Sequence, residues 1–356
     1  MPIDLMSVAP QLDRLFGRPT HNPGERQELL SRLRAGLAAY PLPPLPPSYR
    51  VIATDGSQIE PDRHAPVACF LINTGVVELE YGEHPDARLC SEPRLGLDST
   101  GGAPIDDGDE GREASERVQL DLERSVQEME RLSGLAAAPS ISPTLALQDG
   151  SLMLWVAAAE RFRHDTERYV NRYVAGLDTL RLLADRRTLA VAAYTSRPAS
   201  TEHLSILFGE GDVPGVSPSG VWPVLDRDLY IYLEPGQRSP ALPCDVARRA
   251  VLKRYTPAQN LIWSFYLNAG TEIARVEIPA WVAQDQALLD FVQAGVYQQC
   301  RLNFGYPVAL MEAHEQAVVS EADRRVFWQL VAAKLEHLGL SAFESPKALS
   351  KRIPWS

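Results

Sequence analysis

The sequence predicts an α/β protein in which helices flank a mixed β-sheet and a helical N-terminal arm precedes that sheet. Two observations lead to this fold class. Short runs of β-branched and small apolar residues, such as 51–54 and 144–147, are typical of strands buried inside a sheet. Longer segments with an apolar residue at every third or fourth position alternate with these runs and are typical of amphipathic helices.

The first forty residues are predicted to form the helical arm. Two stretches, "LDRLF" and "ERQELLSRLRAGLAAY", carry the helical spacing of apolar residues. The following stretch 41–50, "PLPPLPPSYR", cannot lie inside a helix, because proline has no amide hydrogen to donate. We therefore expect residues 1–45 to form the arm and its proline-rich connector, and residues 46–356 to form the main domain.

The main domain is predicted to alternate strands and helices. The predicted strands lie within residues 50–57, 67–82, 144–151, 188–198, 221–233 and 260–282. The predicted helices lie within residues 115–138, 152–187, 284–305 and 308–339. Residues 98–112 are rich in glycine and aspartate without apolar periodicity, which predicts a loop.

Net charge, apolar runs and cysteine spacing argue against several classes of protein. The 356 residues carry a net charge of −11, which argues against a broad basic surface for nucleic acid but leaves room for a local groove. The sequence lacks an apolar run long enough for a membrane span, and its N-terminus does not resemble a signal peptide. Its four cysteines are far apart, which is typical of a reduced cytoplasmic protein rather than a disulfide framework or a zinc site.

An Asp-Gly-Ser motif follows a predicted strand twice, at residues 55–57 and 149–151. Glycine lets the chain turn sharply, so Asp55 and Asp149 are expected to project from strand ends, where α/β folds place their sites. Two neighbouring carboxylates repel each other unless a cation binds between them or one is protonated. Hard cations such as Mg²⁺ or Mn²⁺ prefer such oxygen ligands. The alternative is that each aspartate only caps a turn.

Further candidates come from two predicted helices. Tyr306 and His314 are eight residues apart, so they share a helix face if a helix begins near Pro307. A histidine beside metal-bound carboxylates can bind the metal, contact a phosphate or protonate a leaving group, although a lone histidine is more often a core or capping residue. On the helix predicted over 115–138, the acidic candidates are Glu123, Glu128 and Glu130, although most acidic residues on a helix are solvated.

Taken in order, four blocks resemble the NurA nuclease family: "TDGS" on the first strand, a glutamate on the next helix, "LALQDGSL" on the second strand, and "GYPVALMEAHE" near the C-terminus. The order of the blocks matches over nearly the whole main domain. The resemblance implies an RNase H-like core and Mn²⁺ as the cofactor, with Mg²⁺ as the alternative. It also implies a nuclease that degrades DNA 5′→3′, cuts single strands, forms a homodimer and docks on a hexameric HerA-type ATPase during DNA end resection.

The resemblance also assigns residues to the site. Asp55 and Asp149 match the family's metal-binding aspartates, and Tyr306 and His314 match its late tyrosine and histidine. Glu128 matches the helix glutamate best, with the two neighbouring glutamates left as alternatives.

These assignments fit two-metal hydrolysis, in which one cation activates water and the other stabilises the leaving oxygen. Asp55, Glu128 and Asp149 would bind metal. His314 would join them or hold the scissile phosphate, and Tyr306 would stack on a base or position water. The candidate phosphate contacts are Arg197, Arg238, Lys253, Arg254, Lys347, Lys351 and Arg352.

Two other functions remain open. An actin-like phosphotransferase also places Asp, Gly and Ser or Thr after strands, but its pattern has a residue between the aspartate and the glycine, and neither copy here has one. A catalytically inactive adaptor that docks on a DNA translocase would use the same fold, although the presence of Asp55, Asp149 and His314 together favours an active enzyme.

Overall fold

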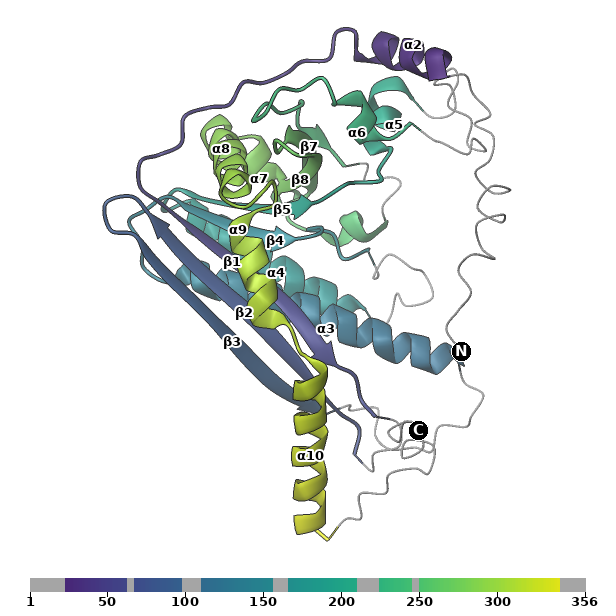
Figure 1. Cartoon of the computed structure of the whole chain (residues 1–356), viewed down its shortest axis with the longest axis vertical. Helices are drawn as coiled ribbons and strands as arrows, with labels where there is room; N and C mark the ends of the chain where they lie inside the picture. Colours follow the sequence, from purple (N-terminus) through teal and green to yellow (C-terminus); the bar gives the residue numbers. More distant parts are fainter. Residues whose placement is uncertain are drawn as a thin grey trace, which may run out of the picture.

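A computed structural model describes residues 23–62, 67–97, 110–155, 166–209, 224–244 and 250–339. Its centre is a mixed sheet of eight strands in the order β3-β2-β1-β4-β5-β8-β7-β6 (Figure 1). The strands are β1 (Tyr49–Ile59), β2 (Cys69–Tyr81), β3 (Asp86–Leu97), β4 (Thr144–Asp149), β5 (Leu189–Thr195), β6 (Leu242–Pro243), β7 (Ile262–Asn268) and β8 (Ile273–Pro279).

The three central strands β1, β4 and β5 are parallel to one another, and all other pairings are antiparallel. Their side chains alternate between two buried faces, as the period of two in a strand requires. Ile52, Ala146 and Val191 belong to one apolar cluster, whereas Ala53 and Leu147 belong to the other. Both faces are covered by helices, which explains why these strands are apolar nearly throughout.

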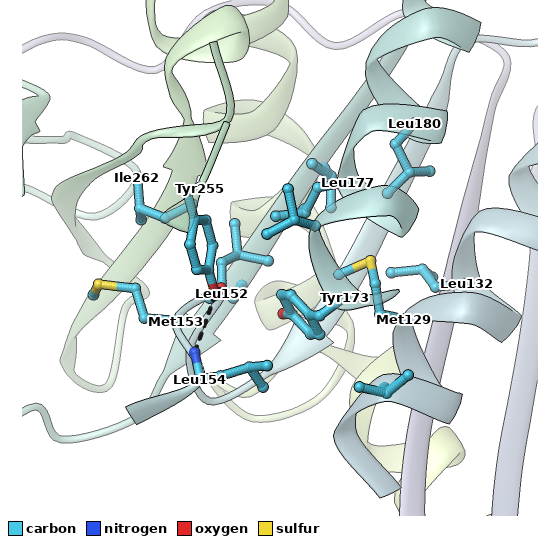
Figure 2. Packing of buried hydrophobic residues seen from close by; sticks show 14 of the residues in the cluster. Met129, Leu132, Leu152, Met153, Leu154, Tyr173, Leu177, Leu180, Tyr255 and Ile262 are labelled. Atoms are coloured by element: carbon cyan, nitrogen blue, oxygen red, sulfur yellow. Dashed lines mark hydrogen bonds between the residues drawn. The ribbon is translucent and has the colours of Figure 1, made fainter. Parts of the chain in front are cut away.

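One face is covered by α3 (Glu110–Ala137) and α4 (Glu167–Ala184), which pack against each other (Figure 1). Met129 on α3 and Tyr173 on α4 are fully buried there. Figure 2 shows Tyr255 beside the segment that follows β4. The Tyr255 hydroxyl donates to the carbonyl of Leu152 over 2.8 Å and accepts from the amide of Leu154 over 3.1 Å, so this segment is fixed to the core.

The opposite face is covered by α8 (Gln286–Leu302) and α9 (Val308–Ala317). Helix α9 crosses β1 and β2 at close range (Figure 1). A Cβ atom at Gly75 of β2 would lie 2.0 Å from the carbonyl oxygen of Ala313, so the helix backbone rests directly on the strand. Without this glycine, α9 could not approach the sheet as it does.

The remaining helices lie at the periphery or link the strands. They are α2 (Pro23–Arg34), α5 (Glu202–Phe208), α6 (Asp226–Leu229), α7 (Ala280–Ala283), α10 (Glu321–His337) and the 3₁₀ helices η4 (Ala250–Arg254) and η5 (Ala258–Asn260). Helix α10 extends beyond the sheet, and only Leu335 is buried among its residues (Figure 1). Within the ranges that the structure describes, every helix is too short or too polar to cross a bilayer.

The predicted α/β class and the mixed sheet are confirmed, but three local predictions are wrong and one strand was missed. Strand β1 does not end at Asp55; it continues to Ile59, because β2 pairs with it along that whole length. Residues 221–233 hold no strand where they are described, since α6 occupies 226–229. Strand β3 was not predicted, because none of its residues is buried and its sequence lacks a buried apolar face. Pro307 caps α9, and the predicted helix 308–339 is divided at 318–320.

Some predictions fall on residues that the structure does not describe. These are the first part of the helical arm, most of the loop predicted over 98–112, and the basic C-terminal tail. The described part of the arm, α2, packs its Leu30 and Leu33 into a small apolar cluster with α6.

Candidate active site

The candidate site lies where β4 ends and β1 continues. The two strands pair in parallel up to Thr54 of β1 and Gln148 of β4. Beyond this point β1 pairs only with β2, so one of its edges is open. A pocket of about 470 Å³ occupies this position. Side chains from both faces of the sheet reach the pocket, because no strand separates the two faces there.

Asp55 and Asp149 reach the pocket on the face covered by α8 and α9. They continue the alternation that places Ala53 and Leu147 on that face. Nδ1 of His314, on α9, lies 2.8 Å from Oδ2 of Asp55. The hydroxyl of Tyr306, just before α9, donates to Oδ1 of Asp149 over 2.8 Å. Each aspartate therefore has its own partner from the segment 306–314.

Glu128 reaches the same pocket from α3, on the other face. Its helix is fixed to β1 by the Thr54 hydroxyl, which donates to the Glu128 carbonyl over 3.1 Å. A Cβ atom at Gly56 would lie only 2.4 Å from Oε1 of Glu128. The glycine of the first Asp-Gly-Ser motif therefore does not make a turn; it makes room for this carboxylate beside Asp55.

Burial raises the pKa values of two of the three carboxylates, Glu128 and Asp149, and neighbouring negative charges add to both shifts. Burial raises the pKa of Glu128 to about 8, the nearby Arg124 guanidinium opposes this shift, and the charges of Asp55 and Asp149 add to it. Burial also raises the pKa of Asp149, the hydrogen bond from Tyr306 opposes it, and the charge of Asp55 adds to it. Bringing these groups together therefore costs free energy that a bound cation would recover.

The donor set fits a hard divalent cation, since three carboxylates from β1, α3 and β4 line one pocket. Within the described ranges, however, no three acidic, histidine or cysteine side chains are already close enough together to hold a metal ion. Each carboxylate instead contacts a different partner. Asp55 contacts His314, and Asp149 contacts Tyr306. Glu128 lies near Arg124. A cation held by all three carboxylates would require them to turn from these partners toward one another.

The two serines of the Asp-Gly-Ser motifs have anchoring roles. Ser57 donates its hydroxyl to the carbonyl of Ala317 at the end of α9, and Asn73 donates to the same carbonyl over 2.8 Å. Ser151 donates to Oε2 of Glu277 on β8 over 2.7 Å. One serine therefore fixes the helix that carries His314, and the other fixes the turn after Asp149.

The choice among the three helix glutamates follows from the orientation of α3. Glu128 lines the pocket, and its side chain is 10% exposed. Glu123 and Glu130 point toward α4, where Arg172 contacts Glu123 over 2.6 Å and Glu130 over 2.9 Å. These two glutamates join α3 to α4 and lie outside the residues that line the pocket.

Comparison with known proteins gives the family. The family model of the NurA domain matches residues 49–319, a span that contains all five proposed site residues. The chain belongs to the NurA family. A comparison with curated proteins finds no match.

NurA nucleases of known structure share the fold. The NurA nuclease from Sulfolobus solfataricus is 15% identical, with a TM-score of 0.56, and the match covers 96% of this chain and 98% of that one. Another NurA structure is 10% identical, with a TM-score of 0.50, and the match covers 95% and 100% of the two chains. A third, which holds dAMP and manganese, is 9% identical, with a TM-score of 0.48 over 93% and 98%. The match at a TM-score of 0.56 shows that this NurA protein has the fold of that nuclease, and the predicted α/β architecture is confirmed.

The basic residues that were predicted to contact phosphates in this NurA protein differ in their exposure to solvent. Arg197 and Lys253 are exposed. Arg238 is only 2% exposed, because its guanidinium stacks 4.1 Å from the Tyr40 ring and its Nη1 donates to the Ser239 carbonyl. The prediction that Arg238 contacts DNA does not fit this burial. Lys347, Lys351 and Arg352 lie outside the described residues.

Sequence reasoning missed two residues at the NurA site. Arg124 lines the pocket one helical turn before Glu128, and this spacing of four residues was the only signal for it. Glu277 receives hydrogen bonds from Ser151 and from the amide of Leu152. No local pattern could have found Glu277, because it comes from a strand far along the chain.

Proposed function

We propose that this NurA-family protein is a metal-dependent deoxyribonuclease that hydrolyses phosphodiester bonds in DNA. The observation that carries the proposal is the meeting of Asp55, Glu128 and Asp149 in one pocket at the open edge of β1. Three carboxylates in one pocket, two of them with pKa values raised chiefly by burial, are suited to a cation and poorly suited to an apolar ligand.

Asp55, Glu128 and Asp149 would hold Mn²⁺, with Mg²⁺ as the alternative, and His314 is a further candidate ligand. When bound, the cations would supply an activated water and a counter-charge for the leaving oxygen. The protein's own part is to place the carboxylates: β1 and β4 fix the two aspartates by their register, and α3 adds the glutamate through the space at Gly56.

Tyr306 and His314 would act on the substrate from the side of α9. The His314 side chain is 65% exposed and can turn from Asp55 toward a phosphate or a leaving oxygen. The Tyr306 hydroxyl donates a hydrogen bond to Asp149. The Tyr306 ring packs edge-on against the Tyr194 ring, with 5.5 Å between the ring centroids, and this contact fixes the position of Tyr306.

The finer features of the proposal follow the family resemblance. They are 5′→3′ exonuclease and single-strand endonuclease activity, a homodimer, and action with a hexameric HerA-type ATPase in DNA end resection. The nuclease domain would span residues 46–356 behind an arm at 1–45. A cytoplasmic location is also part of the proposal, and the four free cysteines support it.

The decisive test is cleavage of end-labelled single- and double-stranded DNA by the pure protein with Mn²⁺, Mg²⁺ or EDTA. Asp55→Ala and Asp149→Ala run alongside, with circular dichroism as the check on folding. We expect cleavage that requires metal and is lost in both variants. Wild-type cleavage by a folded Asp55→Ala protein would contradict the proposal. Failure of the wild type with every metal, even with a HerA-type ATPase present, would favour the inactive adaptor.

A further inference from the structure

Arg124 is a cation in a pocket of carboxylates. Among the described residues that line the pocket, it is the only lysine or arginine, and the same lining includes Asp55, Asp121 and Glu128. Its Nε lies 3.7 Å from Oε1 of Glu128, too far for a hydrogen bond, and the side chain is 34% exposed. Nε itself is buried and has no hydrogen-bond partner within the described part of the chain. Because Nε is shielded, the donors that a ligand could reach are the terminal Nη1 and Nη2 groups of this partly exposed side chain.

Strand β1 leaves space for the Arg124 side chain at Gly56. A Cβ atom at Gly56 would lie 2.7 Å from Cγ and 3.2 Å from Cδ of Arg124. The aliphatic stem therefore packs on the bare backbone of β1, immediately after Asp55. Arginines commonly cover apolar surface with the stem while the charged head stays in the polar space, and here that space is the pocket.

The position of Arg124 opposes the binding of a divalent cation. A guanidinium close to Glu128 lowers the pKa of that carboxylate, but it also repels a metal ion that approaches it. Keeping Glu128 ionised is one use of this charge, and contact with an anionic substrate is a second. A phosphodiester is an anion with two non-bridging oxygens, and the planar guanidinium binds such oxygens with two parallel donors.

We propose that Arg124 binds the scissile phosphodiester, and that it exchanges Glu128 for a phosphate oxygen when a divalent cation takes the Glu128 carboxylate. Arg124 then adds positive charge where negative charge develops on the phosphate during hydrolysis. This inference rests on the proposed nuclease function and adds to it a residue that contacts the substrate.

The test measures metal binding and cleavage separately. Mn²⁺ affinity is measured by calorimetry without DNA, and kcat and KM are measured on a single-stranded oligothymidylate. For Arg124→Met we expect Mn²⁺ to bind about three- to tenfold more tightly, because a repelling charge is gone. We expect kcat/KM to fall about ten- to a hundredfold, because a charged contact to the phosphate is lost. These opposite signs distinguish a substrate contact from a structural role.

The variant Arg124→Lys tests whether the positive charge or the planar shape of the guanidinium is needed. Lysine keeps the positive charge but lacks the planar pair of donors. We expect its Mn²⁺ affinity to remain that of the wild type, while kcat/KM lies between the wild type and Arg124→Met. Arg131→Met is the matched control on the same helix, because Arg131 also pairs with a glutamate, Glu92 over 2.7 Å, but does not line the pocket. The control should change neither quantity.

Two results would overturn the inference. Wild-type cleavage by Arg124→Met would show that the phosphate does not need this residue. A parallel loss of Mn²⁺ affinity, cleavage and thermal stability in Arg124→Met would show that Arg124 only holds Glu128 in place. If the wild type binds Mn²⁺ but cleaves no DNA, even with a HerA-type ATPase present, the proposed function fails instead, and that outcome is separate from both.

Discussion

Ser151 lies 2.7 Å from Glu277, to which it donates a hydrogen bond, and so joins the turn after Asp149 to strand β8. The same Glu277 oxygen accepts from the amide of Leu152 over 3.0 Å, and the other oxygen accepts from Arg275 over 3.0 Å. Arg275 also pairs with Glu202 over 2.7 Å, and all three charged groups are buried. Glu277 is therefore in a position to set the orientation of the Asp149 turn.

Glu277→Gln is predicted to weaken Mn²⁺ binding and cleavage about tenfold. An amide cannot accept on both sides, so it must leave either Arg275 or the Ser151 turn without an acceptor. Glu202→Gln is the matched control, because it disturbs the same arginine without touching the turn. Both variants should lose about 2–4 kcal/mol of unfolding free energy, measured with denaturant. Equal activity in the two variants would contradict a positioning role for Glu277.

Glu128 is predicted to contribute stability to the metal-free protein that is lost as pH rises from about 4.5 to 8, whereas the buried His203, whose pKa is lowered to about 4, acts in the opposite direction below pH 6.5. Burial and the neighbouring carboxylates raise the pKa of Glu128 from 4.5 to about 8. In this window the folded protein holds a proton on Glu128 that the unfolded chain has lost, so rising pH favours unfolding. Between pH 6.5 and 8, where His203 no longer opposes it, the slope should approach about 1.4 kcal/mol per pH unit, and Glu128→Gln should flatten it. Urea melts at several pH values measure this, and an identical slope in the variant would disprove it.

The same proton predicts how metal binding depends on pH. A cation must displace the proton from Glu128, so Mn²⁺ affinity should increase with pH up to about 8 and then level off. Calorimetry in two buffers of different ionisation enthalpy would report the released proton. Absence of proton release at pH 7 would show that Glu128 is not a ligand.

Gly56→Ala is predicted to abolish Mn²⁺ binding more strongly than it destabilises the fold. The added methyl group would lie 2.4 Å from Oε1 of Glu128, so the carboxylate must leave its position beside Asp55. Overpacking of this kind costs about 1–3 kcal/mol of stability. Gly134→Ala on α3 is the control, because its nearest neighbour is 3.9 Å away, and it should leave metal binding intact. Normal Mn²⁺ affinity in Gly56→Ala would refute the role assigned to this glycine.

Tyr306→Phe is predicted to move the acidic limb of the pH–rate profile to higher pH. Burial raises the pKa of Asp149, and the Tyr306 hydroxyl opposes that shift by stabilising the carboxylate. Without the hydroxyl the pKa of Asp149 is higher, so Asp149 stays protonated to higher pH and cannot bind metal there. Cleavage should therefore fall further below the wild type at pH 6 than at pH 8. A uniform loss at both pH values would assign Tyr306 a role other than supporting Asp149.

The local sequence correctly predicted elements whose apolar residues have a strong period. It failed to predict where a strand ends when pairing with a neighbouring strand determines that end. The helix over 115–138 was predicted because its apolar residues repeat with the helical period, and α3 occupies that position. Strand β1 was expected to stop at Asp55 because Asp-Gly is a turn pattern in isolation. Pairing with β2 satisfies the backbone hydrogen bonds through Gly56 and Ser57, so the strand continues.

The sequence by itself determined the family, the α/β class and the residue types of the site, because two Asp-Gly-Ser motifs and a late Tyr and His are patterns along the chain. The tertiary structure decided which groups meet. Glu128 reaches the pocket because β4 ends one residue after its last pairing with β1 and leaves an open edge. Glu277 contacts the turn after Asp149 although it comes from a distant strand, and a pattern along the chain does not encode such a contact. Arg124 lines the pocket because it lies one helical turn before Glu128 on α3, which packs against β1.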